Sequence, residues 1–378
     1  MSPKTFHPRA RITGCDGVGR VDMAVRRLMA QGVVLAALLP LCTGCFFAAR
    51  QGVKALRGDK HATPAACDGM VLPPGMPAGV DGPYAMVQHS VPDPAMAGQD
   101  LVVFLPEHAP GPSPVIFLAH GFGPNRWPSY EGLIRHMVSR GAVVVYAPYP
   151  AFGATHDQRY DALWVGFKAA VAAEGRAMDL TRVGIVGHSY GGGAVPFLAA
   201  RVFGEQGWGG RGAFTLALAP WYSYRTGDAD MARLPPHVLQ GWQVYDGDTM
   251  NDQRMAVDLY RHAPPAGGRY FFQAASGTLT WPQGPTAGCP LVADHRTPGL
   301  GDGVLLKRLA VYPVADALAD QAFVTSADTA AKLAALGQWG PGYHPLVREA
   351  APAAAKPQDA YVFPWTHPQN PRQGEGTP

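Results

Sequence analysis

Short apolar runs alternate with longer amphipathic segments from about residue 84 onward. Each run is rich in β-branched or aromatic residues and is bounded by glycine or proline. Continuous apolar runs of this length are typical of strands that are buried on both faces of a sheet. The predicted strands are 102–105, 115–119, 143–147, 183–186, 214–219, 238–245 and 270–275.

The segments between these runs have the spacing of helices. Helices are predicted over 129–140, 158–174, 191–203, 252–262 and about 303–320. Strands that alternate with helices favour a mostly parallel sheet with helices on both faces. The pattern therefore predicts one α/β domain over residues 84–349.

Residues 1–45 follow a different pattern, which predicts an export signal. Two arginines precede an apolar run over 28–41, and small residues then lead to Cys45. This order is typical of a secretory signal, and the run is shorter than the ~18 residues of a membrane-spanning helix. Met23 would be a sensible start, with residues 1–22 upstream of it.

The end of this signal resembles the lipobox of bacterial lipoproteins. Thr43, Gly44 and Cys45 match its last three positions, although Cys42 stands where leucine is usual. A lipid on Cys45 would anchor the exported protein to a membrane of the bacterial cell envelope, facing the periplasm or the outside. The alternatives are an ordinary cleaved signal peptide and an uncleaved membrane anchor.

Proline-rich segments flank the predicted domain, and two cysteines remain beyond the signal. Residues 46–83 are predicted to be a linker, and residues 350–378 a Pro/Ala-rich tail. An exported protein can form disulfides, so a bridge between Cys67 and Cys289 is one hypothesis. Two unpaired thiols are the alternative, because a sequence gives no distance between them.

The composition excludes several classes of protein. Hydrophobic residues make up 47% of the chain and charged residues only 16%, which excludes an intrinsically disordered chain. A net charge of +3 without a run of lysine or arginine argues against nucleic-acid binding. No GxGxxG follows an early strand and no P-loop motif is present, so nucleotide binding is not supported.

One predicted strand ends in a nucleophile motif. Residues 187–191 read GHSYG, which fits G-x-S-x-G, and small residues follow them at the start of the next helix. The glycines are needed because the serine lies on a strained turn from strand to helix. The motif predicts Ser189 as the nucleophile, and His188 is interpreted as packing within the turn.

A second glycine-rich turn, HGFG at residues 120–123, follows the strand 115–119. Acyl transfer needs hydrogen-bond donors where negative charge develops on the carbonyl oxygen. Backbone N–H groups in such a turn and directly after the nucleophile can supply them. The predicted oxyanion hole is therefore formed by the N–H groups of Phe122 and Tyr190.

The two motifs together resemble the α/β-hydrolase superfamily. The stretch VIFLAHGFG, a helix and then GAVVVYAPYP are similar to its dienelactone-hydrolase, polyester-hydrolase and chlorophyllase branches, over roughly residues 100–300. The resemblance implies an α/β-hydrolase fold and a serine hydrolase with a Ser, Asp, His triad in that chain order. It implies no metal or organic cofactor.

The triad order places the acid after the strand 238–245. Asp246, Asp248 and Asp252 all lie near the end of this strand. Aligning the following helix with the superfamily pattern favours Asp248. Asp252 is the alternative acid, and it could instead cap that helix.

The base should follow the strand 270–275, but the turn directly after this strand contains no histidine. His295 lies in a loop at a suitable distance before the predicted helix at about 303–320, and is taken as the base. His344 is a later alternative, and His367 lies in the predicted tail. A structural role for His295 remains open.

The resemblance also implies a role for Trp221, because a tryptophan after the corresponding strand lines the acyl site of related polyester hydrolases. Ordinary packing is the alternative for this residue.

The sequence thus predicts an exported serine hydrolase that cleaves a small-molecule or polymeric carboxylic ester. The rival hypotheses are an impaired hydrolase-fold lipoprotein that serves as a binding scaffold, and a peptidase, amidase or acyltransferase on the same triad.

Overall fold

A computed structural model describes Cys67 and residues 79–123, 126–265, 267–280, 288–299, 304–338, 343–354, 356–375 and 377–378. These residues all belong to one unit of the chain, Asp59–Pro378. The predicted export signal, with Cys45 and the start at Met23, lies outside the described residues. Nearly all of the predicted linker 46–83 lies outside them as well.

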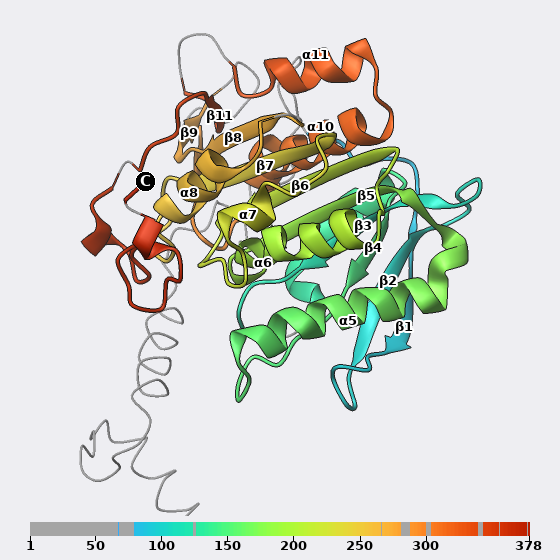
Figure 1. Cartoon of the computed structure of the whole chain (residues 1–378). Helices are drawn as coiled ribbons and strands as arrows, with labels where there is room; N and C mark the ends of the chain where they lie inside the picture. The colour runs from blue at the N-terminus through green and yellow to red at the C-terminus, as the bar shows by residue number, and fades with distance from the viewer. Residues whose placement is uncertain are drawn as a thin grey trace, which may run out of the picture. The chain divides into compact units, whose positions relative to one another are not determined.

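A nine-stranded sheet forms the centre of this unit, in the order β1-β2-β4-β3-β5-β6-β7-β8-β11 (Figure 1). The strands from β4 to β8 in this order are parallel, whereas β1, β2 and β11 pair antiparallel with their neighbours. This arrangement confirms the predicted mostly parallel α/β sheet. The strands are β1 Met86–Pro92, β2 Asp100–Pro106, β3 Ser113–Ala119, β4 Val143–Tyr146, β5 Met178–His188, β6 Gly212–Leu218, β7 Val238–Tyr245, β8 Arg269–Ala274 and β11 Leu346–Glu349.

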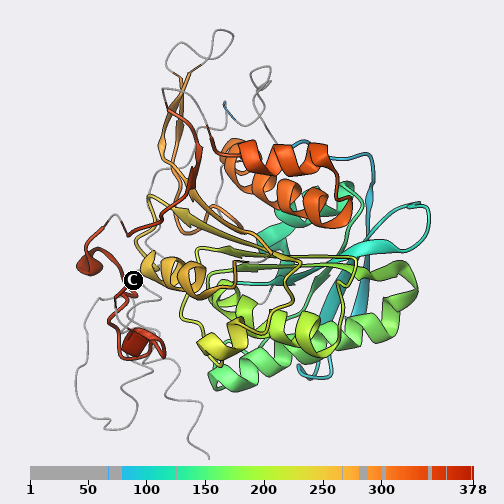
Figure 2. The same ribbon diagram turned by 45° about the horizontal axis from the view of Figure 1, so that its top comes forward.

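Helices cover both faces of the sheet, as the alternation of elements predicts. In Figure 2, α10 and α11 lie on one side of the strands and α5 and α6 on the other. The helices are α4 Glu131–Ser139, α5 His156–Glu174, α6 Tyr190–Ala199, α7 Asp228–Met231, α8 Arg254–His262, α9 Val304–Leu306, α10 Tyr312–Phe323 and α11 Ala327–Ala335.

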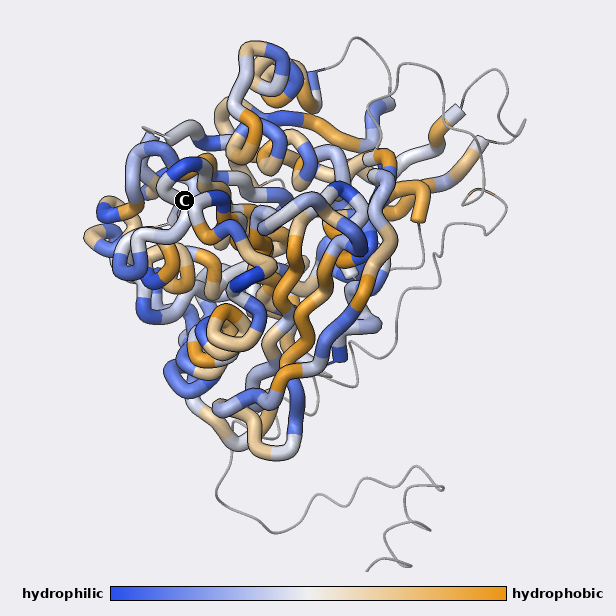
Figure 3. Tube along the Cα trace, turned by 90° about the vertical axis from the view of Figure 1, so that its right-hand side faces the viewer, coloured by the Kyte–Doolittle hydropathy of each residue, from blue (hydrophilic) through white to orange (hydrophobic). Residues whose placement is uncertain are grey.

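Alternate residues of the strands enter two separate cores. In β3, Ile116 and Leu118 pack with α4 and α10, whereas Val115 and Phe117 pack with α5 and α6. Side chains of a strand point alternately to opposite faces, so a strand covered on both faces must be apolar at every position. Figure 3 shows this as hydrophobic strands inside a largely hydrophilic outer layer.

The apolar pattern does not predict the two edge strands, β1 and β11, or a separate two-stranded sheet. Strand β1 is mostly exposed, with the polar residues 88–90 at its centre, and it pairs antiparallel with β2. A hairpin of β9 (Gly277–Leu279) and β10 (Cys289–Leu291) follows β8. A disulfide joins Cys289 in this hairpin to Cys67, with their Cα atoms 5.9 Å apart.

The C-terminal residues are folded against the domain, in contrast to the tail predicted over 350–378. Trp365 is only 2% exposed and Arg372 only 4%. The C-terminus lies beside α8 (Figure 1). The folded unit therefore continues beyond the predicted boundary at residue 349, because long-range contacts hold a segment whose own sequence favours no regular structure.

Candidate active site

The predicted nucleophile, Ser189, lies on a strained turn between β5 and α6. Its φ angle is 55°, which is uncommon for a residue other than glycine. A Cβ at Gly187 would lie 2.3 Å from the carbonyl oxygen of Gly191, and a Cβ at Gly191 would lie 2.1 Å from that of Ala119. The two motif glycines are thus required by close backbone approach.

Backbone hydrogen bonds fix this turn to the end of β6. The N–H of Ser189 donates to the carbonyl of Leu218 (2.9 Å), and its carbonyl accepts from the N–H of Trp221 (2.8 Å). Because both backbone groups of Ser189 are bonded to the neighbouring strand end, its hydroxyl has a defined position at the carboxyl edge of the sheet.

The structure brings Ser189, His295 and Asp248 together in one hydrogen-bonded chain. The distance from Ser189 Oγ to His295 Nε2 is 2.9 Å, and that from His295 Nδ1 to Asp248 Oδ2 is 2.8 Å. Asp248 is 3% exposed, and its other oxygen accepts from the N–H groups of Met250 (2.7 Å) and Asn251 (3.2 Å). The carboxylate is therefore held on both oxygens.

Two opposing effects act on the His295 imidazole. Burial lowers its pKa, but the negative charges of Asp248 and Asp294 and the hydrogen bond to Asp248 raise it by more. The net result is a pKa above the ordinary value for histidine. Such a shift makes the ring a stronger base while Asp248 fixes the proton on Nδ1.

The alternative acids face other partners. Asp252 accepts hydrogen bonds from Arg254 Nη1 (2.9 Å) and from the N–H of Trp365 (2.9 Å). Asp246 accepts from the N–H (2.8 Å) and the hydroxyl of Ser276. Among the three candidate aspartates, the one that meets the imidazole is Asp248.

The β9–β10 hairpin explains why no histidine directly follows β8. The chain leaves β8, forms the hairpin and returns, so that the N–H of Ala293 donates to Ser276 Oγ (2.9 Å) and its carbonyl accepts from Gly247 (2.8 Å). His295 follows two residues later. The hairpin thus lies between the strand and the histidine in the chain, and His295 lies at the edge of the sheet that carries Ser189. His344 and His367 come later in the chain, and His367 stacks on Tyr222.

His188 holds the loop that carries His295, a role that the sequence does not reveal. Its Nε2–H donates to the carbonyl of His295 (2.8 Å), and its Nδ1 accepts from the hydroxyl of Tyr130 (2.7 Å). That hydroxyl in turn accepts from the N–H of Gly121 (2.8 Å). Burial lowers the pKa of His188 to about 3, so the ring is neutral and its two nitrogens have fixed roles. The position of a histidine inside the GHSYG motif is the only signal for it.

The glycine-rich turn 120–123 packs directly against Ser189. The carbonyl of His120 accepts from the N–H of Gly191 (3.1 Å), and a Cβ at Gly121 would lie 3.3 Å from Ser189 Cβ. Phe122 follows this close approach, and Tyr190 is the first residue of α6, where amides have no acceptor within the helix. The two predicted oxyanion donors thus belong to backbone segments that flank Ser189.

Aromatic side chains cluster around Phe122, Tyr190 and Trp221, three residues whose backbone adjoins that of Ser189 or its neighbouring turn. The Trp221 ring lies 5.4 Å from Tyr190 and 5.2 Å from Phe363, measured between ring centroids. On another side, Phe122 is 47% exposed and lies 5.8 Å from Phe152, which is 78% exposed. The guanidinium of Arg159 lies 5.4 Å from the Phe122 ring and 5.8 Å from the Tyr190 ring, so this aromatic cluster also contains a positive charge.

A cavity of about 310 Å³ lies elsewhere, at the amino end of β3. It is lined by Ser113, Pro114, Arg140, Arg182 and Phe323, among others. Since β3 and β5 run parallel, this end of the sheet is opposite to Ser189. The cavity is therefore separate from the site described above.

Within the described residues, no group of three or more histidines, cysteines, aspartates or glutamates could hold a metal ion. Among their helices, none is long and apolar enough to cross a membrane.

A search of protein-family models and of curated proteins gave no match to this chain. Its function is therefore inferred from the geometry of Ser189, His295 and Asp248.

Proposed function

We propose that this chain is a serine hydrolase with an α/β-hydrolase fold that cleaves a carboxylic ester. The observation that carries the proposal is the chain of two hydrogen bonds, 2.9 and 2.8 Å, from Ser189 through His295 to Asp248. The strained turn of Ser189 at the carboxyl edge of a mostly parallel sheet supports it further, as does the chain order Ser, Asp, His.

The reaction uses an acyl-enzyme. Ser189 Oγ attacks the ester carbonyl carbon while His295 Nε2 accepts the hydroxyl proton. The N–H groups of Phe122 and Tyr190 donate to the oxyanion of the tetrahedral intermediate. His295 then gives the proton to the departing alkoxide, leaving an acyl group on Ser189.

Water completes the cycle by the same groups. His295 removes a proton from water, the resulting hydroxide adds to the acyl carbon, and the carboxylic acid leaves as Ser189 regains its proton. Asp248 keeps the imidazole in the tautomer with Nδ1–H and stabilises the positive charge that the ring acquires.

The proposal includes an exported, lipid-anchored location for this enzyme, through Cys45. It is supported by the signal-like sequence of residues 23–45. Radiolabelled palmitate should enter the wild-type protein in a bacterial host and not the Cys45→Ala variant. Equal labelling of the two would contradict the anchor without touching the proposed chemistry.

The enzymatic proposal is tested by Ser189→Ala. The substitution removes the attacking oxygen and leaves the turn intact, so hydrolysis of p-nitrophenyl acetate should fall by at least about 10³-fold. A fluorophosphonate probe should label the wild-type protein at Ser189 and leave the variant unlabelled. Ser90→Ala, at an exposed position of β1, is the matched control. Retained turnover or labelling in Ser189→Ala would overturn the proposal.

A further inference from the structure

The C-terminal strap, defined as residues 356–372, runs beside the acid loop, residues 248–252. A parallel bridge pairs Asn251 with Phe363. Three backbone hydrogen bonds join the two segments, namely Val362 N–H to Thr249 O (2.9 Å), Phe363 N–H to Met250 O (2.8 Å) and Asp252 N–H to Phe363 O (3.1 Å). The acid loop is thus bonded along its length to a segment far away in the sequence.

These bonds lead directly to the Asp248 carboxylate. The N–H of Met250 donates to Asp248 Oδ1 (2.7 Å), while the carbonyl of the same residue accepts from Phe363 (2.8 Å). The Nζ of Lys356 donates to the carbonyl of Asp248 (3.1 Å). A displacement of the strap would therefore move the peptide groups that orient Asp248.

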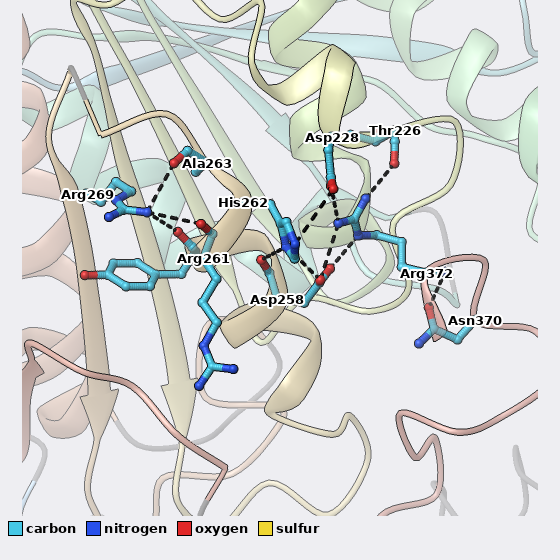
Figure 4. Close-up of polar contacts among 10 residues, drawn as sticks. Thr226, Asp228, Asp258, Arg261, His262, Ala263, Arg269, Asn370 and Arg372 are labelled. Carbon is cyan, nitrogen blue, oxygen red and sulfur yellow. Dashed lines mark hydrogen bonds and ion pairs between the residues drawn. The ribbon is translucent and has the colours of Figure 1, made fainter. Parts of the chain in front are cut away.

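The strap is anchored beyond the acid loop by a buried arginine. Arg372 pairs with Asp258 and also with Asp228 (2.7 Å), and it donates to the carbonyl of Thr226 (3.1 Å) (Figure 4). Its side chain and that of Asp258 are 4% and 1% exposed. A buried ion pair is costly to break on one side, so this anchor gives the strap a fixed position.

The strap also contacts the ring of Trp221, whose backbone is bonded to that of Ser189. The Phe363 ring is half-buried and meets the Trp221 ring edge to face, with centroids 5.2 Å apart. The N–H of Trp221 donates to the carbonyl of Ser189 (2.8 Å). Phe363 thereby contacts the ring of a residue whose backbone is bonded to the nucleophile turn.

We propose that the C-terminal strap is a working part of the active site, in which the backbone of Phe363 positions Asp248 and its ring fixes Trp221 as a wall for the acyl group. The inference rests on the proposed ester hydrolysis. It goes beyond it by assigning a positioning role and a specificity role to a segment outside the predicted catalytic domain.

Two substitutions at one position separate the two roles. Phe363→Ala removes the ring and keeps the N–H, whereas Phe363→Pro removes both, because proline has no backbone N–H. The ratio of kcat/KM for p-nitrophenyl octanoate to that for the acetate should fall about tenfold in both variants. Phe363→Pro should in addition lower kcat about 10- to 100-fold.

The pH profile distinguishes positioning from a general loss of structure. Asp248 raises the pKa of His295, so a carboxylate that is no longer held should let that pKa fall. The acid limb of kcat/KM should then move to lower pH in Phe363→Pro and stay in place in Phe363→Ala. Near-UV circular dichroism of the full chain checks folding, and Val324→Ala, at a residue 66% exposed on another part of the surface, is the control.

The outcomes separate this inference from the proposed function. If a fluorophosphonate probe labels wild-type Ser189 but the two Phe363 variants share one pH profile and one kcat, the positioning role is wrong and the hydrolase proposal stands. If Phe363→Ala leaves the ratio of kcat/KM for the octanoate to that for the acetate unchanged, the specificity role is wrong. This test does not depend on whether Phe363→Pro folds. Absence of labelling in the wild type would overturn the hydrolase proposal and the inference together.

Discussion

The imidazoles of His188 and His295 lie 5.1 Å apart, yet their surroundings shift their pKa values in opposite directions. Burial lowers the pKa of His188 to about 3. For His295, burial also lowers the pKa, but the negative charges of Asp248 and Asp294 raise it by more, so the net shift is upward. Near neutral pH one ring is a fixed hydrogen-bonding group, and the other can exchange the proton that the proposed reaction needs.

Asp294→Asn should move the acid limb of kcat/KM to lower pH. The negative charge of Asp294 raises the pKa of His295, so its removal makes the imidazole lose its proton at lower pH. An asparagine oxygen can still accept from the N–H of Arg296, as Asp294 does at 2.9 Å. The plateau value of kcat/KM at high pH should therefore stay within about threefold of the wild-type value. Asp328→Asn, the same charge change on an exposed turn of α11, should leave the profile in place. A shift to higher pH would contradict the assignment of His295 as the base.

Tyr130→Phe should reduce both stability and turnover. The hydroxyl links the N–H of Gly121 to Nδ1 of His188. Its loss leaves the buried imidazole nitrogen and the half-buried N–H unpaired, at about 1–3 kcal/mol of unfolding free energy. Urea unfolding and p-nitrophenyl acetate assays measure the two effects. The matched control is Tyr146→Phe, because the buried hydroxyl of Tyr146 has no hydrogen-bond partner in the described part of the chain. Equal losses in the two variants would argue against a role for the link.

At the scale of elements, the apolar pattern predicted the strands and helices that are buried on both sides. Strands β3 and β7 and helices α5 and α8 lie close to the predicted ranges. The pattern missed β1, which is mostly exposed and has polar residues at its centre, and the β9–β10 hairpin. It also missed the strap. Trp365 is buried by residues more than a hundred positions away, such as Asp252, and no local pattern can report such contacts.

The candidate site also has residues that local sequence patterns predict and residues whose roles depend on long-range contacts. Ser189 and the turn at 120–123 were predicted because local motifs carry them, and Asp248 and His295 were predicted from chain order. The roles of His188 and Tyr130 depend on a contact between a turn, a strand end and a distant loop. Nothing in the neighbouring sequence indicates that contact.

The hairpin that precedes His295 should depend on the disulfide between Cys67 and Cys289. Without reductant, alkylation of the unfolded chain should modify neither thiol, and with reductant it should modify both. Cys289→Ser should lower the free energy of unfolding by about 2–4 kcal/mol, as measured by urea unfolding without reductant. Free thiols in the oxidised protein would contradict the pairing.

At the scale of the molecule, two buried histidines should make the fold sensitive to mild acid. Burial lowers the pKa of His120 to about 4 and that of His188 to about 3, whereas both titrate near 6.5 when unfolded. Between pH 6.5 and 4 the unfolded chain therefore binds protons that the folded chain does not. His295 has the opposite sign, and the stability that it adds is lost as pH rises above 6.5 through its raised pKa.

The free energy of unfolding should thus fall by about 1.4 kcal/mol per pH unit for each of the two histidines as pH decreases through this window. Urea unfolding at pH 7, 6 and 5 measures the slope. A free energy that stays constant over this range would contradict the predicted slope.

The bond between Cys67 and Cys289 also has a topological consequence. The disulfide closes a covalent loop of main chain from Cys67 to Cys289, which contains both Ser189 and Asp248. His295 lies just outside this loop, a few residues after Cys289. A single proteolytic cut within the loop, for example at the exposed turn around His108, therefore opens the loop without separating its pieces. A nicked molecule would migrate as one species until reductant is added, because the disulfide joins the two pieces.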